Sequence, residues 1–188
     1  DLAVGNYGDQ DVVYLNDGSG DFTGSSSNVG AAGTNTVPID FGDVDGDGDL
    51  DLAVGNRDGG TQNTVYLNDG AGNFSAGNTF GVGVKTVAVS CGDLDGDGDV
   101  DIMIGEELGQ NTPYLNNGSG SFSAGTSFGV GDFSLLADID GDGDLDYVGS
   151  KLGGQNDGYV NDGWAGFSFS CNHGTGSDET RRLAIGDV

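Results

Sequence analysis

A short pattern recurs four times along this chain of 188 residues, and the repetition restricts the possible folds more than any other feature. Each copy joins a Tyr-apolar-Asn triplet to a glycine-rich turn and then to a phenylalanine. The triplets begin at Tyr14, Tyr66, Tyr114 and Tyr159, with spacings of 52, 48 and 45 residues. Because Asn, Asp and Gly tolerate positive φ angles, each copy predicts a β-hairpin. A repeat of this length indicates an array of small, similar units.

Each unit has room for four short strands. In the third unit we expect them at Thr86–Cys91, Asp101–Gly105, Thr112–Asn116 and Ser121–Ser127. Four antiparallel strands per repeat are typical of a β-propeller blade, so the sequence predicts an all-β propeller of about four repeats. A stacked β-solenoid is the less favoured alternative, since it uses shorter repeats of mostly parallel strands. Glycine, at 39 residues, lacks the three-residue period of collagen.

We interpret residues 1–188 as one repeat domain with approximate blades at 1–28, 29–80, 81–128 and 129–171. Residues 1–5 match the second strand of a blade, and residues 183–188 match a first strand. Residues 182–188 could therefore complete the first blade and close a ring. Alternatively, the chain is part of a larger propeller, or neighbouring chains pair head to tail.

Aspartate is concentrated in three loops of the form Asp-x-Asp-Gly-Asp-Gly-Asp-x-Asp, called the Asp loops below. Packing carboxylates this closely is costly unless a cation neutralises them. Ca²⁺ takes six to eight oxygen ligands, which alternating carboxylates supply. Positions 1, 3, 5 and 9 would give side-chain oxygens, and position 7 a backbone carbonyl with its side chain in solvent. The fifteen candidate metal residues are Asp43, Asp45, Asp47, Asp49, Asp51, Asp93, Asp95, Asp97, Asp99, Asp101, Asp138, Asp140, Asp142, Asp144 and Asp146.

The Asp loops resemble EF-hand loops only in their first half. Position 12 is Val54, Ile104 or Gly149 instead of Glu, and strand residues follow. We therefore expect about three Ca²⁺ ions bound in β-hairpin loops, with Mg²⁺ disfavoured because it prefers water ligands and strict octahedral geometry. A fourth site could be split between Asp187, which opens a similar loop, and Asp1, which would close it.

The net charge of −26 should repel nucleic acid and anionic membranes. No run approaches the 18 apolar residues of a membrane span. Two cysteines, Cys91 and Cys171, leave a single disulfide or two isolated thiols as alternatives.

The Asp loops, the Phe-Gly pairs at 80–81 and 128–129, and the Tyr-Leu-Asn hairpins resemble the FG-GAP (VCBS) repeats of integrin α-subunit propellers and of microbial surface proteins. The resemblance covers essentially the whole chain. It implies an extracellular or cell-surface propeller used in adhesion, with calcium bracing the first hairpin of each blade. The four repeats of this chain differ from the seven of an integrin propeller.

A protein or glycan ligand is expected on the face opposite the Asp loops, where the loops between second and third strands vary in charge. Each of these loops contains a glutamine, which either caps a turn, contacts the neighbouring blade or contributes to a ring that binds glycans: Gln10, Gln62, Gln110 and Gln155. A non-catalytic binding or adhesion module is the leading interpretation. A structural subunit of a head-to-tail filament or coat is the alternative, and a polysaccharide-active enzyme is less favoured because no nucleophile–base pair is visible.

Overall fold

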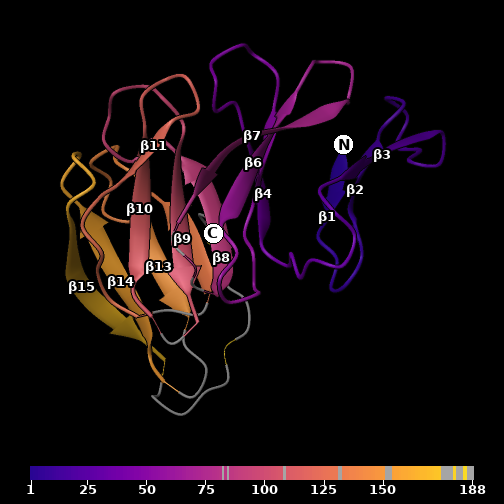
Figure 1. The fold of residues 1–188 in the computed structure, drawn as a ribbon. Helices are drawn as coiled ribbons and strands as arrows, with labels where there is room; N and C mark the ends of the chain where they lie inside the picture. Colours follow the sequence, from indigo (N-terminus) through magenta and orange to yellow (C-terminus); the bar gives the residue numbers. More distant parts are fainter. Residues whose placement is uncertain are drawn as a thin grey trace.

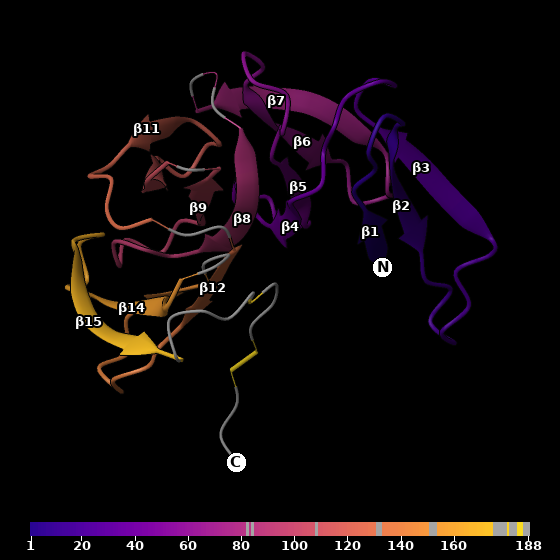
Figure 2. The ribbon, with the colours of Figure 1, turned by 90° about the horizontal axis from the view of Figure 1, so that it is seen from below.

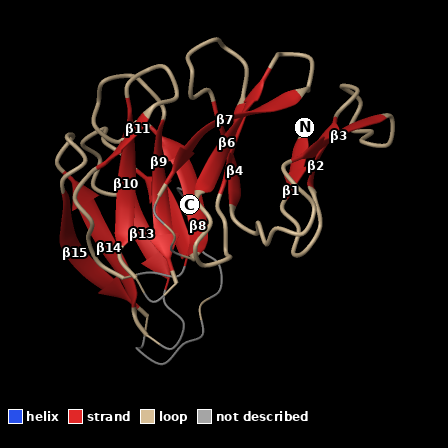
Figure 3. Ribbon diagram, viewed as in Figure 1, coloured by secondary structure: helices blue, strands red, loops and turns tan. Residues whose placement is uncertain are grey.

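The computed structural model of the chain describes residues 1–81, 83, 85–107, 109–130, 133–150, 154–174, 180, 184 and 185. These residues form fifteen β-strands joined by turns and loops, and none of them is helical (Figure 3). The all-β prediction is confirmed.

The strands form four antiparallel sheets, each made of strands that are consecutive in the chain. The first sheet contains β1 (Leu2–Val4), β2 (Asp11–Leu15) and β3 (Ser25–Val29). The second contains β4 (Ile39–Gly42), β5 (Asp51–Val54), β6 (Asn63–Asn68) and β7 (Phe74–Phe80). The third contains β8 (Thr86–Gly92), β9 (Asp101–Glu106), β10 (Asn111–Asn116) and β11 (Phe122–Ala124). The fourth contains β12 (Phe133–Ala137), β13 (Asp146–Ser150), β14 (Asn156–Asn161) and β15 (Phe167–His173).

The four sheets follow one another around an arc (Figures 1 and 2). The first and fourth sheets form its two ends, and the arc is not closed (Figure 2). Sheets of four antiparallel strands arranged in this way are the blades of a β-propeller, so the molecule is a partial propeller. The strands expected in the third unit agree with β8–β11 to within a few residues at each end.

The antiparallel order places the loops at two opposite ends of the sheets (Figure 1). The Asp loops join the first and second strands, and the glycine-rich turns join the third and fourth. Both therefore lie at one end, here called the Asp-loop end. The loops between second and third strands lie at the other end, called the recognition end because the sequence predicts a ligand there.

The hydrophobic core lies between consecutive sheets. In β5 the side chains of Leu52 and Val54 pack toward the first sheet, and the side chain of Ala53 packs toward the third. This division follows from the two-residue period of a strand. Because an inner sheet is covered on both faces, all four residues of β5 are buried. The unbroken apolar runs of the sequence are therefore central strands with two buried faces.

The two cysteines are both free, so the alternative of a Cys91–Cys171 disulfide is wrong. Burial raises the pKa of the Cys91 thiol well above its usual value, which keeps this thiol protonated and unreactive. Among the described residues no helix has the length and hydrophobicity that a membrane crossing requires.

The predicted completion of the first sheet by residues 182–188 concerns residues that mostly lie outside the described ranges. Two of them, Ala184 and Ile185, are described and belong to no strand. Both line a cavity at the outer face of the fourth sheet. Closure of the first sheet stays a prediction.

Candidate metal centre

The ninth-position aspartates form the buried base of the Asp loops. Asp51, Asp101 and Asp146 each begin the second strand of their sheet, and none of them is exposed to solvent. One carboxylate oxygen accepts a hydrogen bond from the backbone nitrogen at position 2 of the same loop, and the other accepts one from the Asn that ends the third strand. The distances are 3.0 and 2.8 Å at Asp51, 2.8 and 2.7 Å at Asp101, and 2.8 and 2.8 Å at Asp146.

Burial makes these carboxylates unfavourable as isolated charges. Desolvation raises the pKa of Asp101 to about 6, against the opposing hydrogen bonds from Asn116 and Leu94. It raises the pKa of Asp51 in the same way. Neighbouring loop aspartates add smaller contributions in the same direction. A bound cation would reverse this penalty, because it stabilises the ionised form.

The first-position aspartates shape the loops. Asp43 accepts hydrogen bonds from the backbone nitrogens of Gly46 and Gly48, at 2.9 and 3.0 Å. Both glycines have positive φ angles, 76° and 96°, which explains why Gly is needed at positions 4 and 6. The same pair of bonds recurs at Asp93 and at Asp138.

Three carboxylates converge in each loop. Positions 1, 3 and 9 each offer one oxygen, and the three oxygens lie within 4.8 Å of one another. The groups are Asp43, Asp45 and Asp51; Asp93, Asp95 and Asp101; and Asp138, Asp140 and Asp146. The remaining candidates, at positions 5 and 7, are not part of these groups.

One carboxylate oxygen in the second loop has no hydrogen-bond partner. The Oδ1 atom of Asp95 is buried and unpaired within the described part of the chain. Burial, with a contribution from Asp97, raises the pKa of Asp95. A buried anionic oxygen without a donor is rare in native proteins. The hard oxygen donors and this orphaned atom fit a Ca²⁺ ion at the site.

The seventh-position aspartates lie against the glycine-rich turn of their own sheet instead of projecting into solvent as expected. A Cβ atom at Gly118 would lie 2.6 Å from Oδ2 of Asp99, and one at Gly163 would lie 2.7 Å from Oδ2 of Asp144. At Gly70 it would clash with the Asp49 carboxylate. The glycine of the turn is therefore required by the close approach of this carboxylate as well as by its positive φ.

The first two Asp loops also contact the sheet that follows them, which the sequence pattern did not predict. The side chain of Val44 lies in the cluster that contains Ile102 and Tyr114 of the third sheet. The side-chain amide of Asn116 donates to the carbonyl of Val44 at 2.7 Å and to that of Val100, in its own sheet, at 2.9 Å. Asn161 makes the equivalent bonds to Leu94 and Leu145, at 2.8 and 3.1 Å. The Asn of the repeated triplet is the sequence signal for this contact.

Asp1 occupies the position expected for the end of a fourth loop. Its Oδ1 atom accepts a hydrogen bond from the backbone nitrogen of Asn16 at 2.8 Å, as Asp51 does from Asn68. Asp187 lies outside the described residues, so a complete fourth site stays a prediction.

At the recognition end, three glutamines hold their own sheets together. The side-chain amides of Gln10, Gln62 and Gln155 donate to backbone carbonyls of Gly30, Gly81 and Gly174, at 2.8, 3.2 and 3.3 Å. This geometry favours the turn-capping interpretation over a ring of free glutamine amides.

Asp11 is a buried carboxylate at the recognition end, where the other sheets have Asn63, Asn111 and Asn156. It accepts hydrogen bonds from the Thr36 hydroxyl and, at 2.9 Å, from the backbone nitrogen of Asn6. Burial raises the pKa of Asp11 despite these bonds. The folded state therefore binds a proton on Asp11 more tightly than the unfolded state does. The contribution of Asp11 to the free energy of unfolding falls as pH rises through the raised pKa.

We expect Asp11→Asn to stabilise the protein at pH 7, where the cost of the buried charge is fully present. The gain should shrink as pH falls toward about 4, where the unfolded carboxyl is also protonated. Urea unfolding of both proteins at the two pH values measures the difference. Asp9→Asn, at an exposed neighbour, removes the same charge and should show no such gain. Equal effects of Asp11→Asn at both pH values would contradict the argument.

The repeats seen in the fold correspond to a known family. A search of curated proteins found no match. The sequence does match the FG-GAP-like repeat over residues 1–54, 45–104 and 93–149. Each matched segment contains at least one complete Asp loop and ends in the strand that follows an Asp loop. With three successive matches that together span residues 1–149, the chain belongs to the FG-GAP-like repeat family.

Proposed function

We propose that this chain is a non-catalytic binding module of an extracellular or cell-surface protein, and that Ca²⁺ in the three Asp loops holds its sheets in place. The observation that carries the proposal is the convergence of three carboxylate oxygens within 4.8 Å in each loop. In the first two loops this group lies next to the contact with the following sheet. Asp45, Asp95 and Asp140 would complete each site between the first- and ninth-position ligands. The family match supports a binding or adhesion role.

The ligand of this module would bind at the recognition end. The loops there differ between repeats while the backbone that carries them is the same, which is the usual arrangement for recognition on a rigid scaffold. A protein or a glycan fits this proposal. Nucleic acid does not, since the net charge is −26 and falls only to −20 with three Ca²⁺ ions bound.

A catalytic role has one weak candidate. The Sγ atom of Cys171 lies 3.2 Å from Nε2 of His173, because residues two apart on β15 share a face. A catalytic dyad also needs a group that orients the imidazole and donors for an oxyanion. His173 has no other polar partner among the described residues, and its side chain is exposed. We therefore assign this pair no catalytic role.

Assembly with a second copy of the chain is the second candidate function. At one end of the arc Leu2 and Tyr14 are 49% and 36% exposed, although their counterparts Leu52 and Tyr66 are covered by the first sheet. At the other end an apolar cavity of about 390 Å³ lies at the outer face of the fourth sheet, and Ala184 and Ile185 contribute to its lining. The outer faces of the first and fourth sheets therefore correspond to the two faces that meet wherever one sheet packs on the next within the chain.

One experiment separates the two functions. Calcium-loaded protein is imaged by electron microscopy, and the same sample is applied to arrays of glycans and extracellular proteins. We expect discrete particles that retain a ligand on the array. Continuous fibres, abolished by Tyr14→Glu, would support the head-to-tail assembly instead. Discrete particles with no ligand on either array would count against the binding module.

A further inference from the structure

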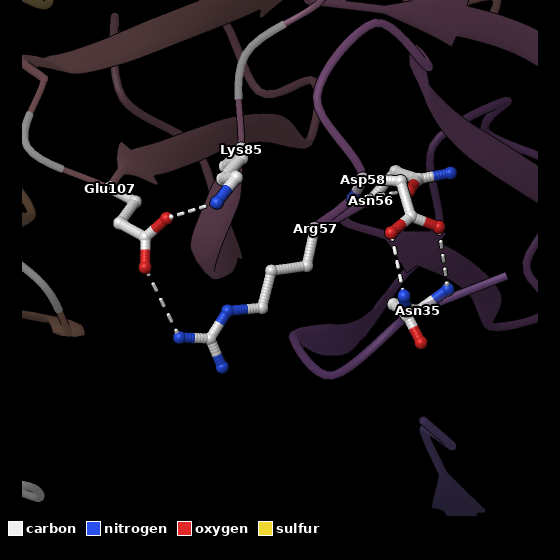
Figure 4. A network of polar contacts seen from close by, with 6 residues as sticks. All are labelled: Asn35, Asn56, Arg57, Asp58, Lys85 and Glu107. Atoms are coloured by element: carbon white, nitrogen blue, oxygen red, sulfur yellow. Dashed lines mark hydrogen bonds and ion pairs between the residues drawn. The ribbon is translucent and has the colours of Figure 1, made fainter. Parts of the chain in front are cut away.

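Positive charge gathers at one place in this acidic protein. Arg57 and Lys85 are two of only five Lys and Arg residues in the chain, and both line one cavity of about 510 Å³ at the recognition end. The same cavity is lined by Asn35, Asp58 and Glu107 (Figure 4) and by Tyr7. Its volume is within the usual range for small-ligand sites, about 300–1,000 Å³.

The lining residues come from corresponding positions of three sheets. Tyr7, Arg57 and Glu107 each lie six residues after the ninth-position aspartate of their repeat. Asn35 and Lys85 each precede the threonine that leads into the next sheet. The backbone bonds also repeat, since Arg57 N donates to Asn35 O and Glu107 N donates to Lys85 O, both at 2.8 Å. The scaffold is thus constant, and only the side chains that face the cavity differ.

Both cations of the cavity contact the same anion, Glu107. Lys85 contacts one oxygen of Glu107 at 3.0 Å, and Arg57 contacts the other at 3.5 Å (Figure 4). The Lys85 ammonium lowers the pKa of Glu107, so this carboxylate stays ionised. Two cations therefore share one anion. Only one guanidinium nitrogen faces Glu107, and within the described residues the Arg57 side chain has no other polar contact. Its remaining N–H groups are available for a bidentate contact with another carboxylate.

The other side of the cavity offers hydrogen-bonding groups and an aromatic ring. Asp58 accepts bonds from the backbone nitrogen and the side-chain amide of Asn35, at 3.3 and 2.6 Å, which fixes both side chains. The side-chain carbonyl of Asn35 has no partner in the described part of the chain. Tyr7 is 75% exposed and presents its ring beside these groups. Hydroxyl groups suit Asn35 and Asp58, and the apolar face of a sugar ring suits an exposed tyrosine.

We propose that this cavity binds a saccharide unit with a single carboxylate, such as a hexuronic acid of an acidic glycan. The inference rests on the proposed function of the chain as a binding module, and it names the ligand class. Arg57 and Lys85 would bind the carboxylate, Asn35 and Asp58 the ring hydroxyls, and Tyr7 the ring face. A dianion such as a phosphate fits less well, because Asp58 and Glu107 make the formal charge of the lining zero.

The test uses the calcium-loaded chain and trigalacturonic acid, with its methyl ester as a matched ligand that lacks the charge. Titration calorimetry should show about 10- to 100-fold tighter binding of the acid than of the ester. Arg57→Gln should remove most of this difference while leaving binding of the ester unchanged. Tyr7→Ala should weaken the binding of both ligands. Ser26→Asp, at an exposed position of β3, changes the net charge by the same amount as Arg57→Gln and should leave both affinities unchanged.

Equal affinity of the native protein for acid and ester would overturn the proposal, as would full retention of the difference in Arg57→Gln. Tighter binding of a short Asp- and Glu-containing peptide than of the trisaccharide would show that the ligand class is wrong. A neutral glycan or a protein captured on the arrays, with no binding of the acid, would overturn this inference and leave the binding module in place.

Discussion

Transfer of the calcium-loaded protein into excess EDTA is expected to abolish its cooperative thermal transition or to lower the midpoint by tens of degrees. At a free Ca²⁺ concentration about 1,000 times the dissociation constant, one site adds about 4 kcal/mol to the free energy of unfolding. Three such sites together approach the whole unfolding free energy of a typical domain, about 5–15 kcal/mol. Without the ion, each loop keeps three carboxylate oxygens within 4.8 Å, and the buried Asp51 and Asp101 lose their compensating charge.

Differential scanning calorimetry across a calcium titration measures this effect, and titration calorimetry at 25 °C gives the number of sites, for which we expect three. Magnesium at equal ionic strength should restore little of the stability. Asp95→Asn should lower both the midpoint and the stoichiometry, because Asp95 belongs to the converging group. Asp99→Asn makes the same change in the same loop outside that group, and it should have a much smaller effect. A midpoint unaffected by EDTA would rule out calcium as the element that holds the sheets.

The second large effect concerns Asn116, whose side chain joins the second and third sheets. Its amide nitrogen donates to Val44 O and Val100 O, and its oxygen accepts from the backbone nitrogens of Gly120 and Asn117, at 3.0 and 2.9 Å. Asn116 is buried, so Asn116→Ala leaves several polar groups without partners. We expect a loss of about 2–4 kcal/mol, or roughly 5–15 °C in the thermal midpoint.

Asn68 provides the matched control for this prediction. It ends the third strand of the second sheet, as Asn116 ends that of the third. It donates to Leu50 O at 3.1 Å and accepts from Gly72 N at 3.1 Å, but it has no bond to a preceding loop among the described residues. Asn68→Ala should therefore lower the free energy of unfolding by half as much as Asn116→Ala, or by less. Since Val44 is at position 2 of the first Asp loop, Asn116→Ala should also weaken calcium binding there. Equal losses in the two variants would show that the bond between sheets contributes nothing.

The strands and the Asp loops could be predicted because their signals are local. The Tyr-apolar-Asn triplets and glycine-rich turns mark hairpins within a few residues of β10 and β14. The alternating aspartates place positions 1, 3 and 9 together because a single tight loop carries all three. The environment of Asp49, Asp99 and Asp144 could not be predicted, since it depends on how closely the turn between the third and fourth strands approaches the loop.

The contacts between sheets also could not be predicted from the sequence. Arg57, Lys85 and Glu107 are separated by more than twenty residues each, and they line one cavity only because consecutive sheets pack side by side. Asn116 and Val44 are brought together by the same packing. Sequence periodicity indicated that sheets stack, but the pairing of particular side chains follows from their twist and separation.

The matching backbone bonds at Arg57 and Glu107 have a consequence for how this protein can diversify. Each side chain facing the cavity is attached to main chain that is fixed without its help. Substitutions at positions 7, 57 and 107 can therefore alter which molecule is captured while folding stays intact. A combinatorial library at these three positions would retarget the protein in the way that antibody loops are varied on their framework.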